Sequence, residues 1–393
     1  MEQTALMPEV TPAPPAKPTG DAPEFAVSTR DLLKEMTLLQ RVVARKTTVP
    51  ILTHLQLQAA GNNLLLTATD GEISLRTVCQ ARVKKEGAFT VPAHKFYEYL
   101  RLLAEGDMTL KPLDNHWVQI RSGRSHTKMV GLSPQNFPKL PLFPVASAIK
   151  LNAQALRTLI SQSLFAISTE ESRYVLNGAL LLLKPDALTM VATDGHRMAH
   201  AEYYAPQAIT KETRVLLPRT ALAELSSLLS ATSGEQIQFA QDETTLYFAI
   251  GSRLLTSRQL SGRFPNYEVV LPKGEASKAL VSRQELLLSL QRVSQFADSR
   301  SNAVRLRFEQ NELRLSSSNS EIGESEDVLQ TNYAGAPKTT GFNSQYLLDF
   351  LRVLDCEKVQ IEFKADELPT ELRPEDVTDQ SFSYRYIVMP IRI

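Results

Sequence analysis

An amphipathic helix opens each of three similar segments of the chain. In the first segment, Leu32, Met36, Leu39 and Val43 recur at helical spacing and form one apolar stripe. The same periodicity predicts a helix in the other two segments, through Leu156, Leu159, Ile160, Leu164 and Ile167, and through Leu286, Leu290, Val293 and Ala297. Each stripe covers one side of its helix, so each helix is predicted to pack against a core.

Strand patterns follow each helix. Residues 55–58 alternate between apolar and polar, a Gly-Asn-Asn turn follows, and residues 64–68 complete a hairpin. Equivalent hairpins are predicted at 179–183 with 188–192 and at 304–309 with 313–315, followed by second helices at 96–103, 221–229 and 346–353 and by further strands such as 359–364 and 384–393. Two helices and several antiparallel strands per segment predict an α+β domain, with the helices on one face of the sheet.

A short motif marks the same place in all three segments. Asp70 lies in Leu-Thr-Ala-Thr-Asp-Gly, Asp194 lies in Met-Val-Ala-Thr-Asp-Gly, and Asn319 takes this position in Leu-Ser-Ser-Ser-Asn-Ser. Their spacings of 124 and 125 residues are far longer than a solenoid repeat of about 20–50 residues and are typical of whole domains. The sequence therefore predicts three tandem copies of one domain, at residues 25–146, 147–273 and 274–393.

The first 24 residues stand outside this repeat. They contain six prolines among Ala, Thr and Glu. Such a segment buries too little apolar surface to offset its ordering entropy. We therefore predict a disordered tail at residues 1–24.

Composition narrows the class of protein. The 393 residues are 43% hydrophobic and 22% charged, as in ordinary globular proteins. The formal net charge is zero, which argues against nucleic-acid binding through bulk positive charge. Cys79 and Cys356 are too few for a disulfide framework or a zinc ribbon. No apolar run approaches the ~18 residues of a membrane span and no basic-then-apolar leader is seen, so we expect a cytoplasmic protein.

Two patterns could carry metal chemistry. Asp70 and Asp194 could pair as ligands in a metal-dependent nuclease site, and His196 and His200 have the four-residue spacing of zinc ligands on a helix. An aspartate before Gly more simply bonds its own backbone in a turn, and no helix is predicted around the histidines. The chain has no phosphate-binding loop and no nucleophile elbow. We therefore expect no metal, no cofactor and no catalytic residue.

Six motifs resemble one known family. They are Val-Pro-Ile-Leu (49–52), Thr-Ala-Thr-Asp (67–70), Arg-Tyr-Val-Leu-Asn-Gly (173–178), Ala-Thr-Asp-Gly-His-Arg-Met-Ala (192–199), Gly-Arg-Phe-Pro-Asn-Tyr (262–267) and Tyr-Ile-Val-Met-Pro-Ile-Arg-Ile (386–393). In this order and spacing, the chain from residue 25 on resembles the bacterial DNA polymerase III β subunit, the sliding clamp. The resemblance implies a homodimer in which two three-domain chains close head to tail into a ring of six similar domains.

The resemblance also implies a function. The ring would encircle double-stranded DNA without sequence preference and tether the replicative polymerase as a processivity factor, with no catalytic site of its own. The clamp loader and other proteins with a clamp-binding motif would be further partners, and no membrane would be involved. Topology would hold the ring on DNA, so weak local phosphate contacts suffice. A non-ring scaffold that binds only proteins stays open as an alternative.

Two sites follow from the resemblance. A pocket between the second and third domains is expected to bind a short partner peptide, where the terminal residues meet residues 193–198, through Leu176, Thr193, Gly195, His196, Arg197, Met198, Pro265, Val270, Ile387, Met389, Pro390, Ile391 and Arg392. DNA contacts are expected from cations on the inner helices, namely Lys34, Arg41, Arg45, Lys46, Lys95, Arg101, Arg157, Arg219, Arg292 and Arg300. Two positions depart from the family pattern: Val269 replaces a frequent arginine, and Glu170 replaces a neutral polar residue.

Overall fold

The computed structural model describes residues 23–392, apart from residues 207, 208, 210, 233, 273, 275, 365–367 and 376–379. The tail predicted at residues 1–24 lies outside the described residues except for Pro23 and Glu24. Glu24 is the first residue of strand β1 (Glu24–Ser28) and pairs with Lys85. The predicted start of the fold at Phe25 is therefore one residue late, because the backbone of Glu24 already joins a sheet.

The apolar stripes form helices whose buried sides match the prediction. Leu32, Met36 and Leu39 are fully buried, and the hydroxyl of Ser28 caps their helix by accepting a hydrogen bond from the backbone N–H of Asp31 at 3.3 Å. The α-helices of the described residues are α1 (Thr29–Val42), α2 (Ala93–Leu100), α3 (Ala153–Ser163), α4 (Arg219–Ser230), α5 (Arg283–Val293) and α6 (Ser344–Val353). None of them is both long and apolar enough to cross a membrane.

Several predicted elements end earlier than expected. The hydroxyl of Ser163 donates to the carbonyl of Leu159 at 2.7 Å, a local bond that competes with regular helix at the end of α3. The predicted strand to residue 393 is too long, because Pro390 has no N–H to donate to a ladder. The observed ends are Val42 for α1, Leu100 for α2, Ser163 for α3, Val293 for α5 and Val388 for the last strand, so the stripe residues Val43, Leu164, Ile167 and Ala297 follow their helices.

The chain forms two compact units. Unit 1 comprises residues up to Ala153 with Ala223–Gln259, and holds an eight-stranded and a five-stranded antiparallel sheet. The order of the larger sheet is β10 (Ile149–Asn152), β15 (Gln236–Gln241), β16 (Thr245–Ile250), β17 (Arg253–Arg258), β4 (Ile73–Gln80), β3 (Asn63–Thr69), β2 (His54–Ala60) and β6 (Gly87–Pro92). The order of the smaller sheet is β5 (Arg82–Lys85), β1, β7 (Asp107–Pro112), β8 (Trp117–Ser122) and β9 (Ser125–Val130).

Unit 2 comprises Gln154–Leu222 with the residues from Leu260 on, and holds an eight-stranded and a four-stranded antiparallel sheet. The order of the larger sheet is β14 (Thr213–Pro218), β11 (Gly178–Leu183), β12 (Ala187–Thr193), β13 (Arg197–Tyr204), β25 (Phe382–Val388), β24 (Thr370–Pro374), β23 (Lys358–Phe363) and β18 (Ser277–Ser282). The order of the smaller sheet is β21 (Gly323–Gln330), β20 (Glu312–Asn319), β19 (Ala303–Glu309) and β22 (Lys338–Asn343).

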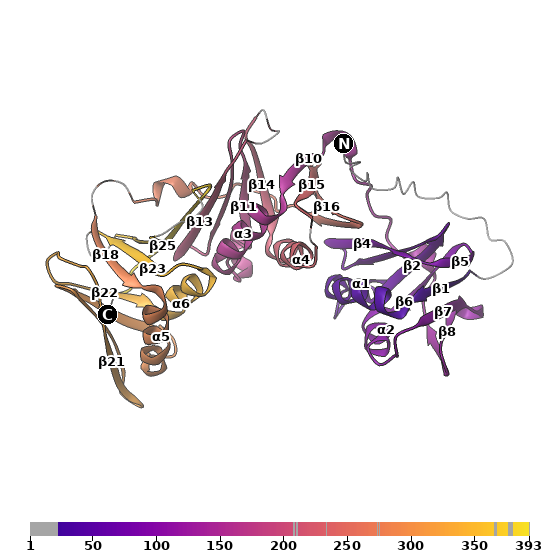
Figure 1. Cartoon of the computed structure of the whole chain (residues 1–393), viewed down its shortest axis with the longest axis horizontal. Helices are drawn as coiled ribbons and strands as arrows, with labels where there is room; N and C mark the ends of the chain where they lie inside the picture. Colours follow the sequence, from indigo (N-terminus) through magenta and orange to yellow (C-terminus); the bar gives the residue numbers. More distant parts are fainter. Residues whose placement is uncertain are drawn as a thin grey trace. The chain divides into compact units, whose positions relative to one another are not determined.

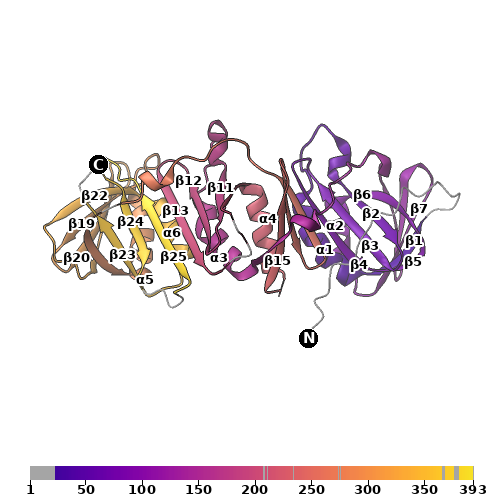
Figure 2. The same ribbon diagram turned by 90° about the horizontal axis from the view of Figure 1, so that it is seen from above.

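The core of each unit lies between its helices and its sheets. In unit 1, α1 packs on β3 and β4 and contacts α2 (Figure 1). In unit 2, α5 packs on β20 and β21 and contacts α6, which Figure 2 shows from a second direction. The predicted arrangement, with the helices on a sheet face, is confirmed in both units.

Each eight-stranded sheet runs across a boundary between two repeats. In unit 1, β17 of the second repeat pairs with β4 of the first. In unit 2, β13 of the second repeat pairs with β25 of the third. We name these the first and second junctions. The second repeat is divided between the two units because it supplies a sheet strand to each junction.

Candidate functional site

The C-terminal segment lies beside the Thr-Asp-Gly turn of the second repeat. β25 pairs with β13 so that Ile387 faces Met198 across the ladder. One residue past the strand, the backbone N–H of Met389 donates to the carbonyl of His196 at 2.9 Å. The predicted meeting of the chain end with residues 193–198 is confirmed, and the pairing holds a terminus that would otherwise fray.

Apolar side chains cover the face of this sheet that points away from α6. Met198 and Ile387 are 3% and 1% exposed and form the floor, whereas Val270 and Met389 are each 37% exposed. The buried cluster comprises Leu180, Leu182, Val191, Met198, Leu216, Phe264, Tyr267 and Ile387, with Val175, Leu176, Leu260 and Leu271 packed against it. We name the predicted members that belong to it, adjoin its members in the chain or follow β25 the C-terminal apolar surface: Leu176, Met198, Pro265, Val270, Ile387, Met389, Pro390 and Ile391. The backbone N–H of Ile391 donates to the carbonyl of Gly341 in β22 at 2.9 Å.

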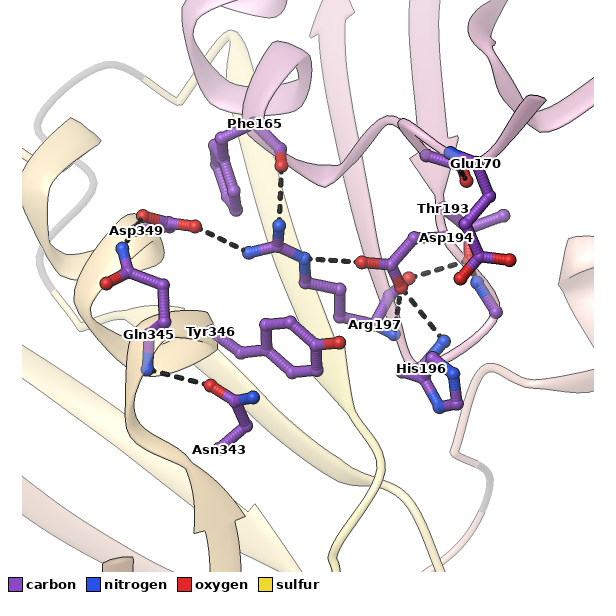
Figure 3. Close-up of polar contacts among 12 residues, drawn as sticks. Phe165, Glu170, Thr193, Asp194, His196, Arg197, Asn343, Gln345, Tyr346 and Asp349 are labelled. Carbon is purple, nitrogen blue, oxygen red and sulfur yellow. Dashed lines mark hydrogen bonds and ion pairs between the residues drawn. The ribbon is translucent and has the colours of Figure 1, made fainter. Parts of the chain in front are cut away.

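The Thr-Asp-Gly motif forms a self-bonded turn. Oδ1 of Asp194 accepts hydrogen bonds from the backbone N–H groups of His196 and Arg197 at 2.9 and 3.1 Å, as Figure 3 shows. The hydroxyl of Thr193 donates to the carbonyl of Arg197 at 2.6 Å and accepts from the N–H of Gly195 at 3.1 Å. Asp70 and Asn319 accept the equivalent backbone bonds in their own repeats. The turn role predicted for the aspartates is confirmed.

Arg197 points away from the apolar floor. It precedes Met198 in β13, so its side chain lies on the opposite sheet face. There its guanidinium donates to Asp194 at 2.9 Å, to Asp349 of α6 at 2.8 Å and to the carbonyl of Phe165 at 2.7 Å, as Figure 3 shows. The grouping of Arg197 with the peptide-contacting side chains stays a prediction; within the described residues its guanidinium links the turn to α6.

Charge and burial explain why this arginine is stable where it lies. Only 10% of its side chain is exposed, and the Tyr346 ring lies 4.4 Å from its guanidinium. Burial opposes the charged form, but Tyr386, Asp349 and Asp194 together raise the pKa of Arg197 above its ordinary value. Arg197 therefore stays protonated and is neutralised by two carboxylates within unit 2.

Arg173 is a site residue that the sequence analysis did not select, although it opens one of the family motifs. Its Nη1 donates to the carbonyl of Asp194 at 2.5 Å, and its Nε pairs with Glu170 at 2.9 Å. Gly195 has φ of 92°, and a Cβ there would lie 2.7 Å from that Nη1. The positive φ of Gly195 therefore favours glycine, and a Cβ there would also displace the guanidinium of Arg173. Glu170, the position expected to depart from the family pattern, holds Arg173 beside the turn through this ion pair.

His200 lies two residues beyond Met198 on the same sheet face. It is 6% exposed, and its Nδ1 is buried with no hydrogen-bond partner, 3.9 Å from Oε2 of Glu202. Burial lowers the pKa of His200, Glu202 opposes this shift, and the cations Arg385 and Lys184 add to it. The folded protein therefore holds this imidazole neutral at pH 7.

We expect the folded protein to lose stability as pH falls from about 7 to 5. An unfolded histidine binds a proton in this range, whereas folded His200 resists protonation because its pKa is lowered. The unfolded state then holds more protons, so the free energy of unfolding decreases as pH falls. His200→Gln should flatten this dependence more than His116→Asn, a change at an exposed histidine. Thermal unfolding at several pH values measures the pH dependence of stability. An equal pH dependence in the two variants would contradict its attribution to His200.

The cations predicted to face DNA fall into two groups. In the first, a neighbouring side chain holds the cation, as where Nε of Arg41 donates to Glu224 at 2.8 Å. The other members are Lys95 with Glu98, Arg292 with Asp327, and Arg101 beside the Tyr97 ring. In the second group the side chains are exposed and form no ion pair within the described part of the chain: Lys34, Arg45, Lys46, Arg157, Arg219 and Arg300.

The two metal patterns do not form clusters. His196 is exposed in the turn, whereas His200 is buried in β13, so the pair lies on a turn and strand rather than on a helix. Across the residues that the structure describes, no group of three or more His, Cys, Asp or Glu could hold a metal ion. Asp70 and Asp194 instead bond the backbone of their own turns.

Comparison with known proteins decides the family. Three domain profiles of the DNA polymerase III beta subunit match in order: the N-terminal domain at residues 23–141, the central domain at 150–266 and the C-terminal domain at 268–392. The chain belongs to the DNA polymerase III β subunit family. The predicted fold, three tandem α+β domains of this family, is confirmed; the predicted boundaries near residues 146 and 273 stay predictions.

Individual members of this family align along nearly their whole length. The beta sliding clamp of Caulobacter vibrioides is 32% identical over 368 residues, covering 92% of this chain and 98% of that protein. The beta sliding clamp of Escherichia coli is 31% identical over 372 residues, covering 94% and 100%. A crystal structure of the sliding clamp of Bartonella birtlesii has a TM-score of 0.89 at 32% identity, covering 95% of this chain and 100% of that chain.

Proposed function

We propose that the chain is a DNA sliding clamp: two copies close head to tail into a ring around double-stranded DNA and tether the replicative polymerase. Membership of the β subunit family supports this proposal. The observation that carries it is a pair of sheet edges, β9 and β21. They are the strands that a third junction of the same kind would use.

The repeats identify these two edges. β4, β13 and β21 each follow the turn of their repeat that contains Asp70, Asp194 or Asn319, and β17 and β25 are the closing strands of the second and third repeats. Each junction joins a strand that follows a turn to a closing strand: β4 pairs with β17 at the first junction, and β13 pairs with β25 at the second. Two strands of these kinds are left without such a partner: β21, which follows the turn of the third repeat, and β9, which closes the first repeat. Each lies at the edge of its sheet. A second copy supplies the partner for each edge, and a twofold axis repeats the contact.

Retention on DNA tests the ring. The clamp, loaded by the clamp loader of its own organism, should stay on nicked circular DNA and be lost when that DNA is linearised. A protein that binds only other proteins would be retained on neither form. A chain that remains monomeric at micromolar concentration in light scattering would contradict the ring.

The exposed cations after α1 should supply sliding contacts to phosphates. Arg45 and Lys46 are exposed and unpaired among the described residues, unlike Arg41 with its Glu224. Arg45→Ala with Lys46→Ala should shorten retention on circular DNA and reduce the salt slope by roughly one unit per lost contact. Lys139→Ala with Lys150→Ala, which removes two exposed lysines elsewhere, should leave both unchanged. Wild-type retention in the first variant would make these side chains ordinary solvated charges.

The C-terminal apolar surface is proposed as the docking site for a short peptide of the polymerase, the clamp loader and other partners. Its floor is buried while Val270 and Met389 remain partly exposed, an arrangement in which one or two apolar anchors can dock. Val269, 74% exposed, makes one side of it apolar rather than charged. The predicted polar members Thr193, Gly195, His196 and Arg392 lie at or beside the turn and the chain end, with Arg197 positioning the turn.

The proposed role requires no catalysis by the chain itself. Asp70, Asp194 and Arg197 are each engaged in structural bonds. The proposed place of action is the cytoplasm, where bacterial DNA is replicated.

A further inference from the structure

Arg76 of β4 is a half-buried cation without a counter-ion. Its Nε is buried with no hydrogen-bond partner, and it forms no ion pair within the part of the chain that the structure describes. Burial lowers the pKa of Arg76 with no opposing effect from a carboxylate of these residues, yet an arginine keeps its charge at pH 7. A cation withdrawn from water in this way ordinarily has an anionic partner.

This cation lies at the first junction, on the sheet face that points away from α1. The next residue, Thr77, donates to Glu35 of α1, so the alternation along β4 places Arg76 on the opposite face. Across the ladders Arg76 faces Thr67 of β3 and Leu254 of β17. Its surroundings therefore come from both repeats that meet at this junction.

The internal repeats relate this place to the C-terminal apolar surface. Ser74 and Met198 each face the residue before the turn aspartate in the adjacent strand, so they are equivalent. Met198 faces Ile387 across the second junction, whereas Ser74 faces Thr256, and the two hydroxyls share a hydrogen bond. With Arg76 two residues further along β4, the first junction carries a polar and cationic surface where the second junction carries an apolar one.

Apolar side chains lie next to this cation. We name residues 131–148, between β9 and β10, the first linker. Phe143 of the first linker packs against the buried cluster that contains Leu254, the residue that faces the cation. The neighbours of Phe143 in the chain, Leu142 and Val145, are 56% and 72% exposed. A ligand at this place would thus meet a cation together with exposed apolar side chains.

Carboxylates that adjoin this junction in the chain bind other groups. Glu72, the residue before β4, pairs with Arg258 at 3.5 Å. Asp242, the residue after β15, accepts a hydrogen bond from the hydroxyl of Tyr247 at 2.6 Å. The described part of the chain therefore leaves Arg76 open to an anion from outside it.

The N-terminal segment, residues 1–22, lies outside the described structure and carries three carboxylates but one lysine. It joins unit 1 at Pro23, which lies so close to β6 that a Cβ on Gly87 would be 3.0 Å from its ring. Through the ladders Gly87 is level with Cys79 of β4, three strands away. For strand spacings of about 4.8 Å and a rise of about 3.3 Å per residue, Arg76 lies about 17 Å from Gly87.

The length of the N-terminal segment selects one of its carboxylates. Asp21 is two residues from Pro23, so it reaches only about 7 Å from that point. Glu9 is fourteen residues from Pro23, which allows a reach of up to about 46 Å. Met7 and Val10 lie on either side of Glu9 in the sequence. Glu9 therefore combines sufficient reach with apolar neighbours that match the exposed side chains of the first linker.

We propose that residues 6–10 dock on this sheet face of the first junction and that the carboxylate of Glu9 pairs with the guanidinium of Arg76. Met7 and Val10 then pack against exposed apolar side chains of the first linker. An arginine and a carboxylate can form two parallel charge-assisted hydrogen bonds. Because the segment belongs to the same chain, its effective concentration is in the millimolar range, and even a weak contact is populated. The docking requires neither the proposed ring nor a partner peptide.

Photo-crosslinking in the full-length protein tests this docking. Benzoylphenylalanine in place of Met7 should crosslink to the first linker or to β3 and β4, as mapped by mass spectrometry. Glu9→Gln and Arg76→Gln should each reduce the yield of this crosslink about fivefold. Glu2→Gln, the same change at a carboxylate outside the docked residues, is the matched control and should leave the yield unchanged.

A charge swap separates the pairing from a loss of structure. Glu9→Arg with Arg76→Glu should recover most of the crosslink that either change alone removes. A yield that is the same in the wild type and in Arg76→Gln would overturn the pairing. Crosslinks that map to the C-terminal apolar surface would overturn the proposed place of docking. If position 7 formed no crosslink at all, the N-terminal segment would not be the occupant, and Arg76 would be left to an acidic segment of another protein.

Discussion

Truncation of the chain after Val388 should abolish binding of a short partner peptide and leave the dimer intact. A peptide of five or six residues offers little area, so its affinity depends on one or two apolar anchors. The truncation removes Met389, which is 37% exposed, together with half-buried Pro390 and Ile391, which follow it in the chain. Subunit association should survive because β9 lies on another sheet, and β21 lies at the opposite edge of its sheet from β22, the strand that Ile391 contacts.

A single substitution gives a graded version of this test. Met389→Ala should weaken peptide binding by about 1–2 kcal/mol. Val49→Ala, which truncates an exposed valine in unit 1, is the matched control and should have no effect. Fluorescence anisotropy with a labelled peptide copied from the clamp-binding segment of the polymerase measures both. If the truncated protein bound the peptide with wild-type affinity, the C-terminal segment would be structural and the docking site would lie elsewhere.

Arg253→Ala should destabilise unit 1 by about 3–5 kcal/mol, because it leaves the carboxylate of Glu35 buried without its cation. Glu35 of α1 is 8% exposed and accepts hydrogen bonds from Nε and Nη2 of Arg253 at 2.8 and 2.6 Å. Thr77 adds a third bond to this carboxylate at 2.8 Å. Burial raises the pKa of Glu35, but the bonds from Arg253 and Thr77 outweigh it and lower the pKa overall.

The matched control replaces both partners. Glu35→Leu with Arg253→Met removes the pair without leaving a buried charge, and should cost much less than either Glu35→Ala or Arg253→Ala. Trp117 is the only tryptophan and lies in β8 of unit 1, so its fluorescence during urea unfolding reports on this unit. If the double variant were as unstable as Arg253→Ala, the loss would come from packing rather than from the unpaired charge. The pKa of Glu35 is lower in the folded than in the unfolded protein, so this group stabilises the fold at pH values above its unfolded pKa. The stabilisation should disappear as the pH falls and the carboxylate of the folded protein becomes protonated.

The amphipathic helices and the aspartate turns were predictable from the sequence alone. The stripe of Leu32, Met36 and Leu39 predicts a helix because helix periodicity is visible in a short window, and all three side chains are buried. Asp194 could be assigned to a turn because its bonds go to the backbone two and three residues later. The ends of elements were predicted less well, as at Ser163, because they depend on single local bonds.

The sequence did not predict on which face of the sheet the side chain of Arg197 lies. The motif around it resembles the family's peptide site, and nothing nearby in the sequence identifies Asp349, which lies 152 residues further on. Only the pairing of β13 with β25 shows which sheet face each residue takes. Arg173 was different, because it opens Arg-Tyr-Val-Leu-Asn-Gly, one of the motifs that resemble the family.

The sequence by itself determined the repeat, the secondary structure within each repeat, the turns and the family, because these depend on periodicity and on residues close together in the chain. The tertiary structure alone decided how the repeats join. The Glu35–Arg253 pair spans 218 residues, and the two junctions pair strands from different repeats. Such contacts are selected by the complementarity of distant surfaces, and an individual sequence carries no local pattern for them.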